Sequence, residues 1–300
     1  MSSIVETNPA TVKLSPNVVA ASPDEIDLPV TVIERRRGWQ IIDLRELWQY
    51  RELLVFLTWR DIKVRYKQTV LGAAWAVLQP LATMIVFTMF LGQVAGISTG
   101  DIPYPLFVFA GTLPWTFFSN AITSSSQSII GNQNLITKIY FPRLLIPAGA
   151  AGAGLIDLAI SLGIFLVMML CFGFLPTSGM LAAPFILLLM VLAALGTGTL
   201  LAALTVAYRD FKYVIPFGVQ LWMFATPCIY MQTESVTGAT ANMLLPLNPA
   251  YGLIANFRQA MLGGPLDYYS LSVSASVAIA VFMLSCWYFR KVERSFADII

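Results

Sequence analysis

The side chain most able to do chemistry inside this chain is Asp157, a carboxylate deep within the apolar run of residues 144–172. An ionisable group inside a membrane-spanning segment is expected to have a functional role or a polar partner. Asp157 could therefore accept a hydrogen bond from a neighbouring helix, contact a substrate or carry a proton. Gly149, Gly152 and Gly154 precede it, and small residues let helices approach closely. This setting favours the interhelical hydrogen bond.

Groups for enzymatic catalysis are scarce in the rest of the sequence. There is no His, and the three Cys have no metal or redox spacing. We find no pair of acids, and no nucleophile with a base, of the kind that a membrane-embedded glycosyltransferase or acyltransferase needs. The phosphate-binding pattern G-x-x-x-x-G-K-[ST] does not occur. We therefore expect no enzyme activity in this chain, and any ATP hydrolysis would belong to a separate polypeptide.

The composition is that of a multi-pass membrane protein. Hydrophobic residues make up 57% of the 300 residues and charged residues only 11%, against roughly 25% charged in soluble domains. A spanning helix needs about 20 mainly apolar residues. Six runs come close to this length: residues 71–95, 105–130, 144–172, 181–208, 214–230 and 271–289. The predicted fold class is an all-α integral membrane protein with six transmembrane helices.

The Lys and Arg residues indicate the topology. Ten of the 18 lie at or before Lys67, and most others form clusters between the apolar runs: Lys138 with Arg143, Arg209 with Lys212, and Arg290 with Lys291 and Arg294. Cationic residues near spanning helices stay on the cytoplasmic side. If all six runs cross the membrane, every cluster falls on one side, so both termini are predicted to be cytoplasmic. Arg258 is the exception.

Two further segments are predicted to be helices that do not span. Residues 43–67 repeat apolar residues at helical spacing, with Trp48 and Trp59 among basic residues. Such a helix lies in the membrane interface or packs on a soluble partner. Residues 250–262 follow Asn248-Pro249, precede Gly263-Gly264-Pro265, and are too short to span. We expect either a re-entrant segment or an ordinary surface helix there.

These segments divide the chain into three regions. Residues 1–30 are predicted to be a disordered cytoplasmic tail, because they are rich in Pro and lack aromatic residues. Residues 31–70 contain the cytoplasmic amphipathic interface helix. Residues 71–300 form the six-helix transmembrane domain.

Five segments stand out along the chain: RDIKVRYKQTVLGAAWAVLQPL (60–81), NLITKIYFPR (134–143), Arg209-Asp210 followed by PFGVQLWMFATPCIY (216–230), LNPAY (247–251) and the final ERSFADII. In this order they resemble segments of the ABC-2-type permease subunits of polysaccharide exporters, which include O-antigen and teichoic acid exporters. The resemblance covers residues 31–300. It implies an N-terminal interface helix, a cytoplasmic coupling helix after the second span, and a re-entrant segment before the last.

The resemblance also implies the function and the partners. It implies a homodimer that forms the channel, with two copies of a separate nucleotide-binding ATPase subunit that binds ATP and Mg. This complex would export lipid-linked, O-antigen-like polysaccharide across the bacterial cytoplasmic (inner) membrane, as lipopolysaccharide biosynthesis requires. Membrane lipids are further expected partners. We expect no cofactor or metal in this chain and no nucleic-acid partner.

The best candidate for contact with the ATPase is the inner loop that follows the second apolar run. A short helix with exposed apolar residues can dock in a groove on a partner. With the family resemblance, the predicted coupling residues are Asn134, Leu135, Lys138, Tyr140, Phe141 and Arg143. Read without the resemblance, this segment is a basic inner loop.

A glycan path needs aromatic faces, and the chain has 19 Phe, 11 Tyr and 7 Trp. The rings that we predict to line the path are Phe87, Phe90, Trp115, Phe117, Phe118, Trp222, Phe224 and Tyr230. The cluster PWTFF (114–118) is the strongest of these candidates. Arg258 is a further path candidate, since it could meet headgroups or an acidic sugar at the exit. The alternative is that these rings belong to the interfacial belt or to ordinary packing.

Two alternative functions remain open. One is an ABC-2 exporter of another substrate, such as teichoic acid, a drug or a small lipid. The other is a proton-coupled secondary transporter. Such transporters usually carry several embedded ionisable residues and weak internal repeats. This chain has one embedded acid and no repeat that we detect, which favours the exporter.

Overall fold

The computed structural model of the chain describes residues 44–67, 74–94, 102–175, 177–226, 228, 243–293 and 296. Within these ranges every regular element is a helix, which confirms the predicted all-α class. The expected tail over residues 1–30 lies outside the described residues, as do residues 31–43. The division into three regions therefore stays a prediction.

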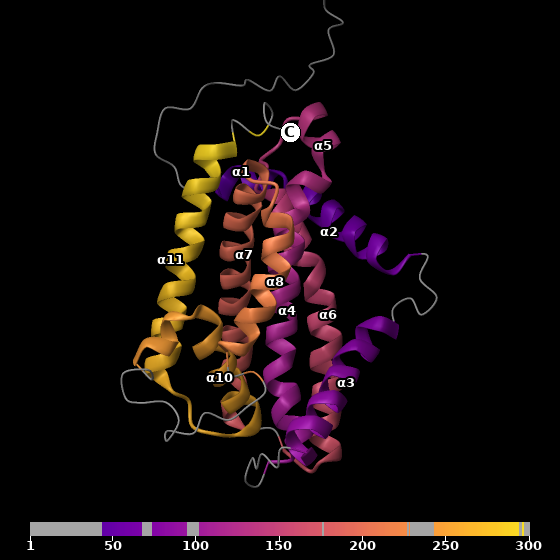
Figure 1. Cartoon of the computed structure of the whole chain (residues 1–300), viewed down its shortest axis with the longest axis vertical. Helices are drawn as coiled ribbons and strands as arrows, with labels where there is room; N and C mark the ends of the chain where they lie inside the picture. Colours follow the sequence, from indigo (N-terminus) through magenta and orange to yellow (C-terminus); the bar gives the residue numbers. More distant parts are fainter. Residues whose placement is uncertain are drawn as a thin grey trace, which may run out of the picture. The chain divides into compact units, whose positions relative to one another are not determined.

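Four helices are long and apolar enough to cross a membrane. They are α4 (Tyr104–Gly131), α6 (Leu145–Cys171), α7 (Ala183–Ala207, preceded by the short η3, Ser178–Ala182) and α11 (Tyr268–Val292). Figure 1 shows them running side by side. α4 is the most buried of the four and packs against both α6 and α7, while α7 also packs against α11. The main core therefore forms around α4.

Small residues on α7 explain how closely these helices pack. A Cβ added at Gly198 would lie 2.7 Å from the Cβ of Ser125 on α4, and one at Gly196 would lie 2.7 Å from the Cα of Phe282 on α11. Such close approach is typical of membrane helices, where small residues bring backbones together. The Ser125 hydroxyl donates to the carbonyl oxygen of Pro147 at 2.9 Å, so this buried polar group is satisfied within the bundle.

Two predicted spans are represented by shorter helices. α3 (Trp75–Phe87) continues into the π-helical η2 (Thr88–Val94), and α8 covers Phe211–Phe224. Neither is among the helices of spanning length in the described ranges. The predicted spans 71–95 and 214–230 both extend into residues that the structure does not describe. The count of six spans therefore stays a prediction.

The remaining helices are short. The predicted helix 43–67 is divided into α1 (Leu44–Gln49) and α2 (Arg51–Tyr66), and α5 (Gln133–Lys138) follows α4. η4 (Leu245–Leu247) precedes α10 (Pro249–Leu262). The Asn248 side chain caps α10 at its start, and Gly263 ends it with a positive φ of 78°. The predicted boundaries of this helix are thereby confirmed.

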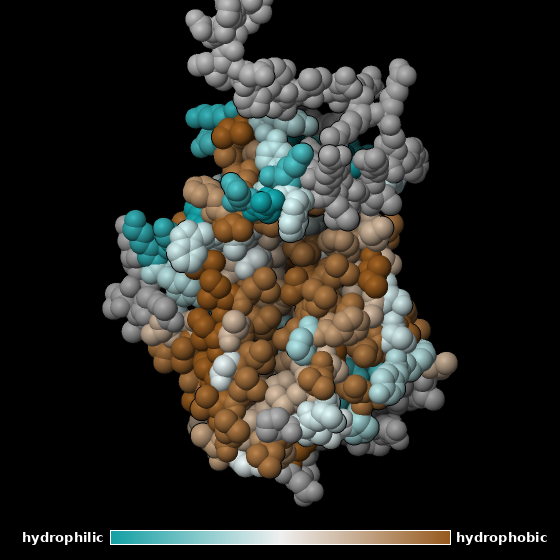
Figure 2. Space-filling model, turned by 180° about the vertical axis from the view of Figure 1, so that it is seen from behind, coloured by the Kyte–Doolittle hydropathy of each residue, from teal (hydrophilic) through white to brown (hydrophobic). Residues whose placement is uncertain are grey.

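The surface agrees with a membrane protein. Figure 2 shows a broad hydrophobic face over the bundle, and many of its hydrophilic side chains gather toward the end that carries α5. Large apolar side chains such as Val167 and Leu170 of α6 are exposed on this fold. In water such a surface would be costly, whereas hydrocarbon accommodates it.

Candidate functional site

The predicted coupling segment, residues 134–143, lies between α4 and α6 and has two distinct sides. Asn134, Lys138 and Tyr140 are exposed, with Tyr140 at 67%, and the neighbouring Ile139 is exposed as well. Leu135 is half-buried, while Phe141 is buried in an apolar cluster with Leu145, Ile146 and Phe289. An apolar and basic surface is therefore presented outward, and its other side is fixed to the bundle. Phe141, which the sequence predicted to contact the ATPase, points instead into the core of this subunit.

Arg143 joins this segment to the end of the chain. Its guanidinium donates a hydrogen bond to the backbone carbonyl of Glu293, which follows α11. Close by, Phe296 packs edge-on against Phe289 at 5.3 Å between ring centroids. The segment before α6 and the end of α11 thus belong to one packed unit at the α5 end of the bundle.

Asp157 of α6 meets α2. Its carboxylate accepts hydrogen bonds from the guanidinium of Arg65 and the hydroxyl of Tyr66. Of the three roles considered from the sequence, the interhelical contact is the one that the structure shows. Burial, and then the hydrogen bond with Asp157, raise the pKa of Tyr66 to about 12. The Tyr66 hydroxyl is therefore a neutral donor at physiological pH.

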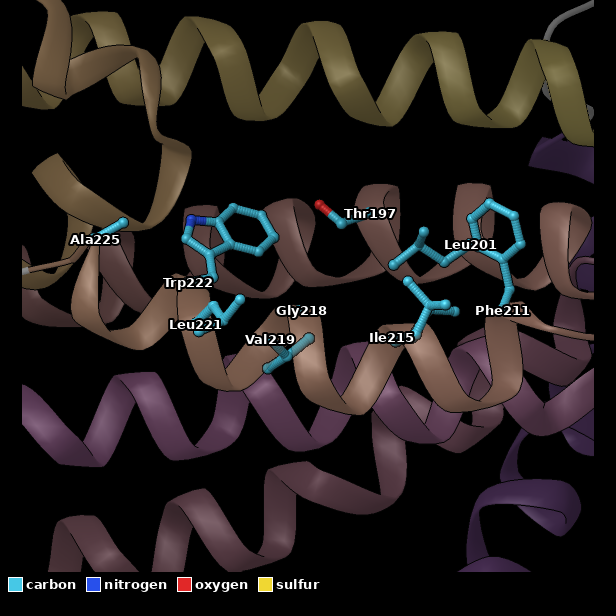
Figure 3. Close-up of a pocket in the computed structure, with 10 residues that line it drawn as sticks. Thr197, Leu201, Phe211, Ile215, Gly218, Val219, Leu221, Trp222 and Ala225 are labelled. Atoms are coloured by element: carbon cyan, nitrogen blue, oxygen red, sulfur yellow. The ribbon is translucent and has the colours of Figure 1, made fainter.

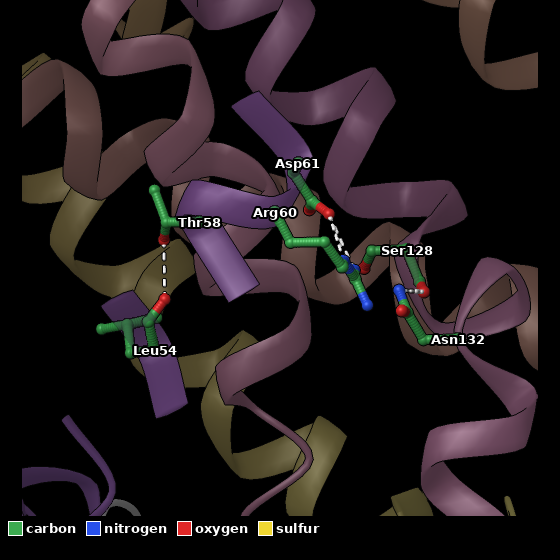
Figure 4. A network of polar contacts seen from close by, with 6 residues as sticks. All are labelled: Leu54, Thr58, Arg60, Asp61, Ser128 and Asn132. Atoms are coloured by element: carbon green, nitrogen blue, oxygen red, sulfur yellow. Dashed lines mark hydrogen bonds and ion pairs between the residues drawn. The ribbon is translucent and has the colours of Figure 1, made fainter. Parts of the chain in front are cut away.

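Glycine residues let α2 reach α6. A Cβ added at Gly149 would lie 3.2 Å from the Cβ of Leu57, and one at Gly152 would lie 3.2 Å from Oγ1 of Thr58. Thr58 Oγ1 in turn donates to the carbonyl oxygen of Leu54, one turn earlier in α2 (Figure 4). The sequence predicted close approach at these glycines, but it did not identify α2 as the partner.

The opposite side of α2 is exposed and aromatic. Val55, Phe56 and Trp59 are exposed, together with Trp48 of α1. The guanidinium of Arg51 lies 5.2 Å from the Trp48 ring centroid, and the ammonium of Lys63 lies 5.4 Å from that of Trp59. Cations beside exposed tryptophans are typical of helices in a membrane interface. This side is therefore suited to lipid headgroups.

Asn248 links α8 to α10. Its Oδ1 accepts from Nε1 of Trp222 at 2.9 Å and from the backbone N–H of Ala250 at 3.1 Å, and its Nδ2 donates to Oγ1 of Thr226 at 2.9 Å. Sequence reasoning used Asn248 only as a helix start and missed this role. The motif Leu247–Tyr251 was the available signal. One amide thus fixes the end of α8 against the short helix.

Arg258 lies inside the fold. Its side chain is 8% exposed, its guanidinium carbon lies 4.0 Å from the ring centroid of Phe107, and Nη2 donates to the carbonyl oxygen of Cys228 at 2.9 Å. Gly111 leaves the space for this contact, because a Cβ there would lie 2.0 Å from the Cys228 oxygen. In this conformation Arg258 packs against α4 and is not at a surface where headgroups would reach it.

The predicted path aromatics that the structure describes differ widely in exposure. Trp115, Phe117 and Phe118 are buried, and Phe118 packs edge-on against Trp222 at 5.2 Å between centroids. Phe87 and Trp222 are half-buried, whereas Phe90 and Phe224 are exposed. Tyr230 lies outside the described residues. The PWTFF cluster thus contributes to the core of this subunit, and the assignment of these rings to a path stays a prediction.

One apolar hollow lies between α7 and α8. It has a volume of about 510 Å³, and Figure 3 shows side chains of α8, including Ile215 and Trp222, beside Thr197 and Leu201 of α7. Trp222 is the only predicted path residue among its described lining residues. The walls of this hollow are almost entirely apolar, so they suit an apolar chain better than a sugar.

Residues 52–262, from α2 to the end of α10, match the ABC-2 type transporter family. The chain belongs to this family. The ABC-2 match thus includes the Asp157 contact, the coupling segment and the α10 contacts. The resemblance seen in the sequence motifs is confirmed.

Known relatives of this ABC-2 chain are similar over most of their length. It is 30% identical over 259 residues to the O-antigen export system permease protein RfbA of Myxococcus xanthus, covering 86% of this chain and 98% of the relative. It is 26% identical over 250 residues to a protein of that name from Klebsiella pneumoniae, covering 83% and 95%. It is also 26% identical over 238 residues to the polysialic acid transport protein KpsM of Escherichia coli, covering 79% and 92%.

Proposed function

We propose that this ABC-2 chain is the transmembrane subunit of an ATP-driven exporter of lipid-linked polysaccharide in the bacterial cytoplasmic membrane. The observation that carries the proposal is its similarity to the RfbA permeases over nearly their full length. The family membership and the four helices of spanning length support it. An O-antigen-like glycan is the proposed substrate.

The proposed assembly is a homodimer with two copies of a separate ATPase subunit that binds ATP and Mg. Each subunit would have six spans and cytoplasmic termini, with α3 and η2 forming part of the first span and α8 part of the fifth. Residues 31–70 would include the interface helix, and α10 would be the re-entrant segment. The outward side of the coupling segment, with Lys138, Ile139 and Tyr140, is the proposed contact with the ATPase.

The contacts of the coupling segment suggest how force would spread from that point. Residues 139–144 lead directly from α5 into α6. The Arg143 contact with Glu293 would carry motion to the end of α11, and the Arg65–Asp157 pair would move α2 together with α6. No step in this transfer needs chemistry in the chain itself.

The test combines co-purification with an export assay. The chain should purify with a separate ATPase, and vesicles holding both should export lipid-linked polysaccharide only while ATP is hydrolysed. Full export beside a hydrolysis-dead ATPase would overturn the proposal. An exporter of another substrate would instead hydrolyse ATP without any response to lipid-linked polysaccharide.

A proton-coupled transporter is the less favoured alternative. The Asp157 carboxylate is paired with Arg65, which supports a role in holding helices together. If replacing Asp157 by Asn abolished transport only in the presence of a proton gradient, the proton-coupled alternative would be favoured.

A further inference from the structure

A polar crevice lies between α2 and the last turns of α4. It has a volume of about 370 Å³, within the range of roughly 300–1,000 Å³ typical of small-molecule sites. It is lined by Asp61, Val64 and Arg65 of α2, by Ser124, Gln127 and Ser128 of α4, by Asn132 at the end of α4, and by Ala150 of α6. Figure 4 shows Arg60 and Asp61 on α2 facing Ser128, with Asn132 beyond it. None of the predicted path residues that the structure describes is among its lining residues.

Several polar groups in the crevice have hydrogen-bonding capacity to spare. Asp61 accepts two hydrogen bonds from Arg60, at 2.7 and 3.0 Å, and both end on the same carboxylate oxygen. Within the described part of the chain, no hydrogen bond is made by the other oxygen, by the Ser124 hydroxyl or by the Gln127 amide. A carboxylate accepts hydrogen bonds, a hydroxyl both donates and accepts them, and an amide group has one acceptor oxygen and two N–H donors.

The charges around the crevice are already paired. Asp61 is paired with Arg60, and Arg65 is paired with Asp157. An anionic or cationic ligand would have to compete with one of these pairs. A neutral ligand with hydroxyl groups would not, because hydroxyls can donate to Asp61 and exchange hydrogen bonds with Ser124 and Gln127. Val64 and Ala150 add apolar surface that suits the C–H face of a sugar ring.

We propose that this α2–α4 crevice binds one sugar unit of the exported polysaccharide, through hydrogen bonds to Asp61, Ser124 and Gln127. The inference rests on the proposed function and adds a recognition site to it. The crevice lies toward the α5 end of the bundle, on the side proposed to be cytoplasmic. It would therefore hold the glycan before the glycan crosses the membrane. Because its walls belong to α2 and α4, a bound sugar would bridge these two helices.

Photo-cross-linking tests the occupant directly and keeps the polar groups intact. Val64 lines the crevice and is 71% exposed, while Val55 on the other side of α2 is 66% exposed and serves as a matched control. Each is replaced by p-benzoylphenylalanine in the full complex, within cells that make the polysaccharide. After irradiation and denaturing purification, we expect a glycan adduct at position 64 and none at position 55. Equal glycan labelling at both positions, a phospholipid adduct alone at position 64, or no adduct there would overturn the proposal.

Substitutions then test whether the site contributes to transport. Each lost hydrogen bond should weaken binding about three- to tenfold. Ser124→Ala and Gln127→Ala should therefore raise the concentration of lipid-linked polysaccharide needed for half-maximal ATPase stimulation by that factor. Gln220→Ala, at an exposed position of α8, should leave this concentration unchanged. An unchanged concentration in both Ser124→Ala and Gln127→Ala would overturn the proposal. If the wild-type complex exported no polysaccharide at all, the proposed function itself would fail.

Discussion

Arg65 of α2 and Asp157 of α6 form an ion pair between a helix that carries the exposed Trp59 and a helix long enough to cross a membrane. Tyr66, the last residue of α2, donates to the same carboxylate. Asp157 lies midway along α6, so the contact holds the end of α2 against the middle of this helix. The amphipathic composition of α2 alone does not predict this position. Any movement of α6 would be transmitted to α2 through this contact.

Removing one partner of this pair should destabilise the fold. Asp157→Ala leaves the partly buried guanidinium of Arg65 without its carboxylate, and we expect a loss of about 1–2 kcal/mol, because the pair keeps some access to solvent. A double-mutant cycle with Arg65→Ala, measured by thermal unfolding in detergent, isolates the interaction. Additive losses in the double variant would show that the two side chains do not interact.

The close backbone approach at Gly111 of α4 gives a second prediction. Gly111→Ala would place a Cβ 2.0 Å from the carbonyl oxygen of Cys228 and 2.5 Å from Nη2 of Arg258. We expect a cost of about 3 kcal/mol or more, the upper end for inserting atoms into a packed core, since backbone must move. The readout is the yield and melting temperature of the purified protein.

Gly163→Ala in α6 is the matched control for this substitution. A Cβ at Gly163 meets nothing within 4 Å, so the change should be neutral or stabilise the helix by up to about 1 kcal/mol. Normal yield and melting temperature for Gly111→Ala would mean that Arg258 and Cys228 do not pack against α4 as described.

A third prediction concerns the amide that links α8 to α10. Asn248→Ala leaves Nε1 of Trp222 without its acceptor and removes the cap of α10, and we expect a loss of about 2–3 kcal/mol. Asn248→Asp keeps the acceptor for Trp222 and Ala250 but loses the donor to Thr226, so it should be milder. The melting temperatures of both variants are compared with that of Asn120→Ala, which removes no described hydrogen bond. Equal effects of all three would contradict a linking role for Asn248.

The sequence predicted all four helices of spanning length among the described residues, because length and hydropathy directly report the fit of a segment to a bilayer. It also predicted close packing at Gly149 and Gly152, and a hydrogen bond for Asp157. It did not predict that α2 supplies the partner, because the hydropathy of residues 43–67 does not show how deep the helix end lies. Likewise, the exposed position that topology suggested for Arg258 differs from its buried contact with Phe107, since a charge count does not register cation–π packing.

The coupling segment allows binding to the ATPase to be separated from stability. Tyr140 is exposed, so Tyr140→Ala should leave the melting temperature within about 2 °C of wild type, as surface substitutions usually change stability by no more than about 0.5 kcal/mol. If this residue contacts the ATPase, the same variant should retain less ATPase in co-purification, by about tenfold for a contact of roughly 1.4 kcal/mol.

Phe141→Ala should instead destabilise the fold by about 3–5 kcal/mol, because its ring is buried beside Leu145 and Phe289. Full retention of the ATPase by Tyr140→Ala, together with full retention by Lys138→Ala, would place the contact with the ATPase elsewhere on the chain.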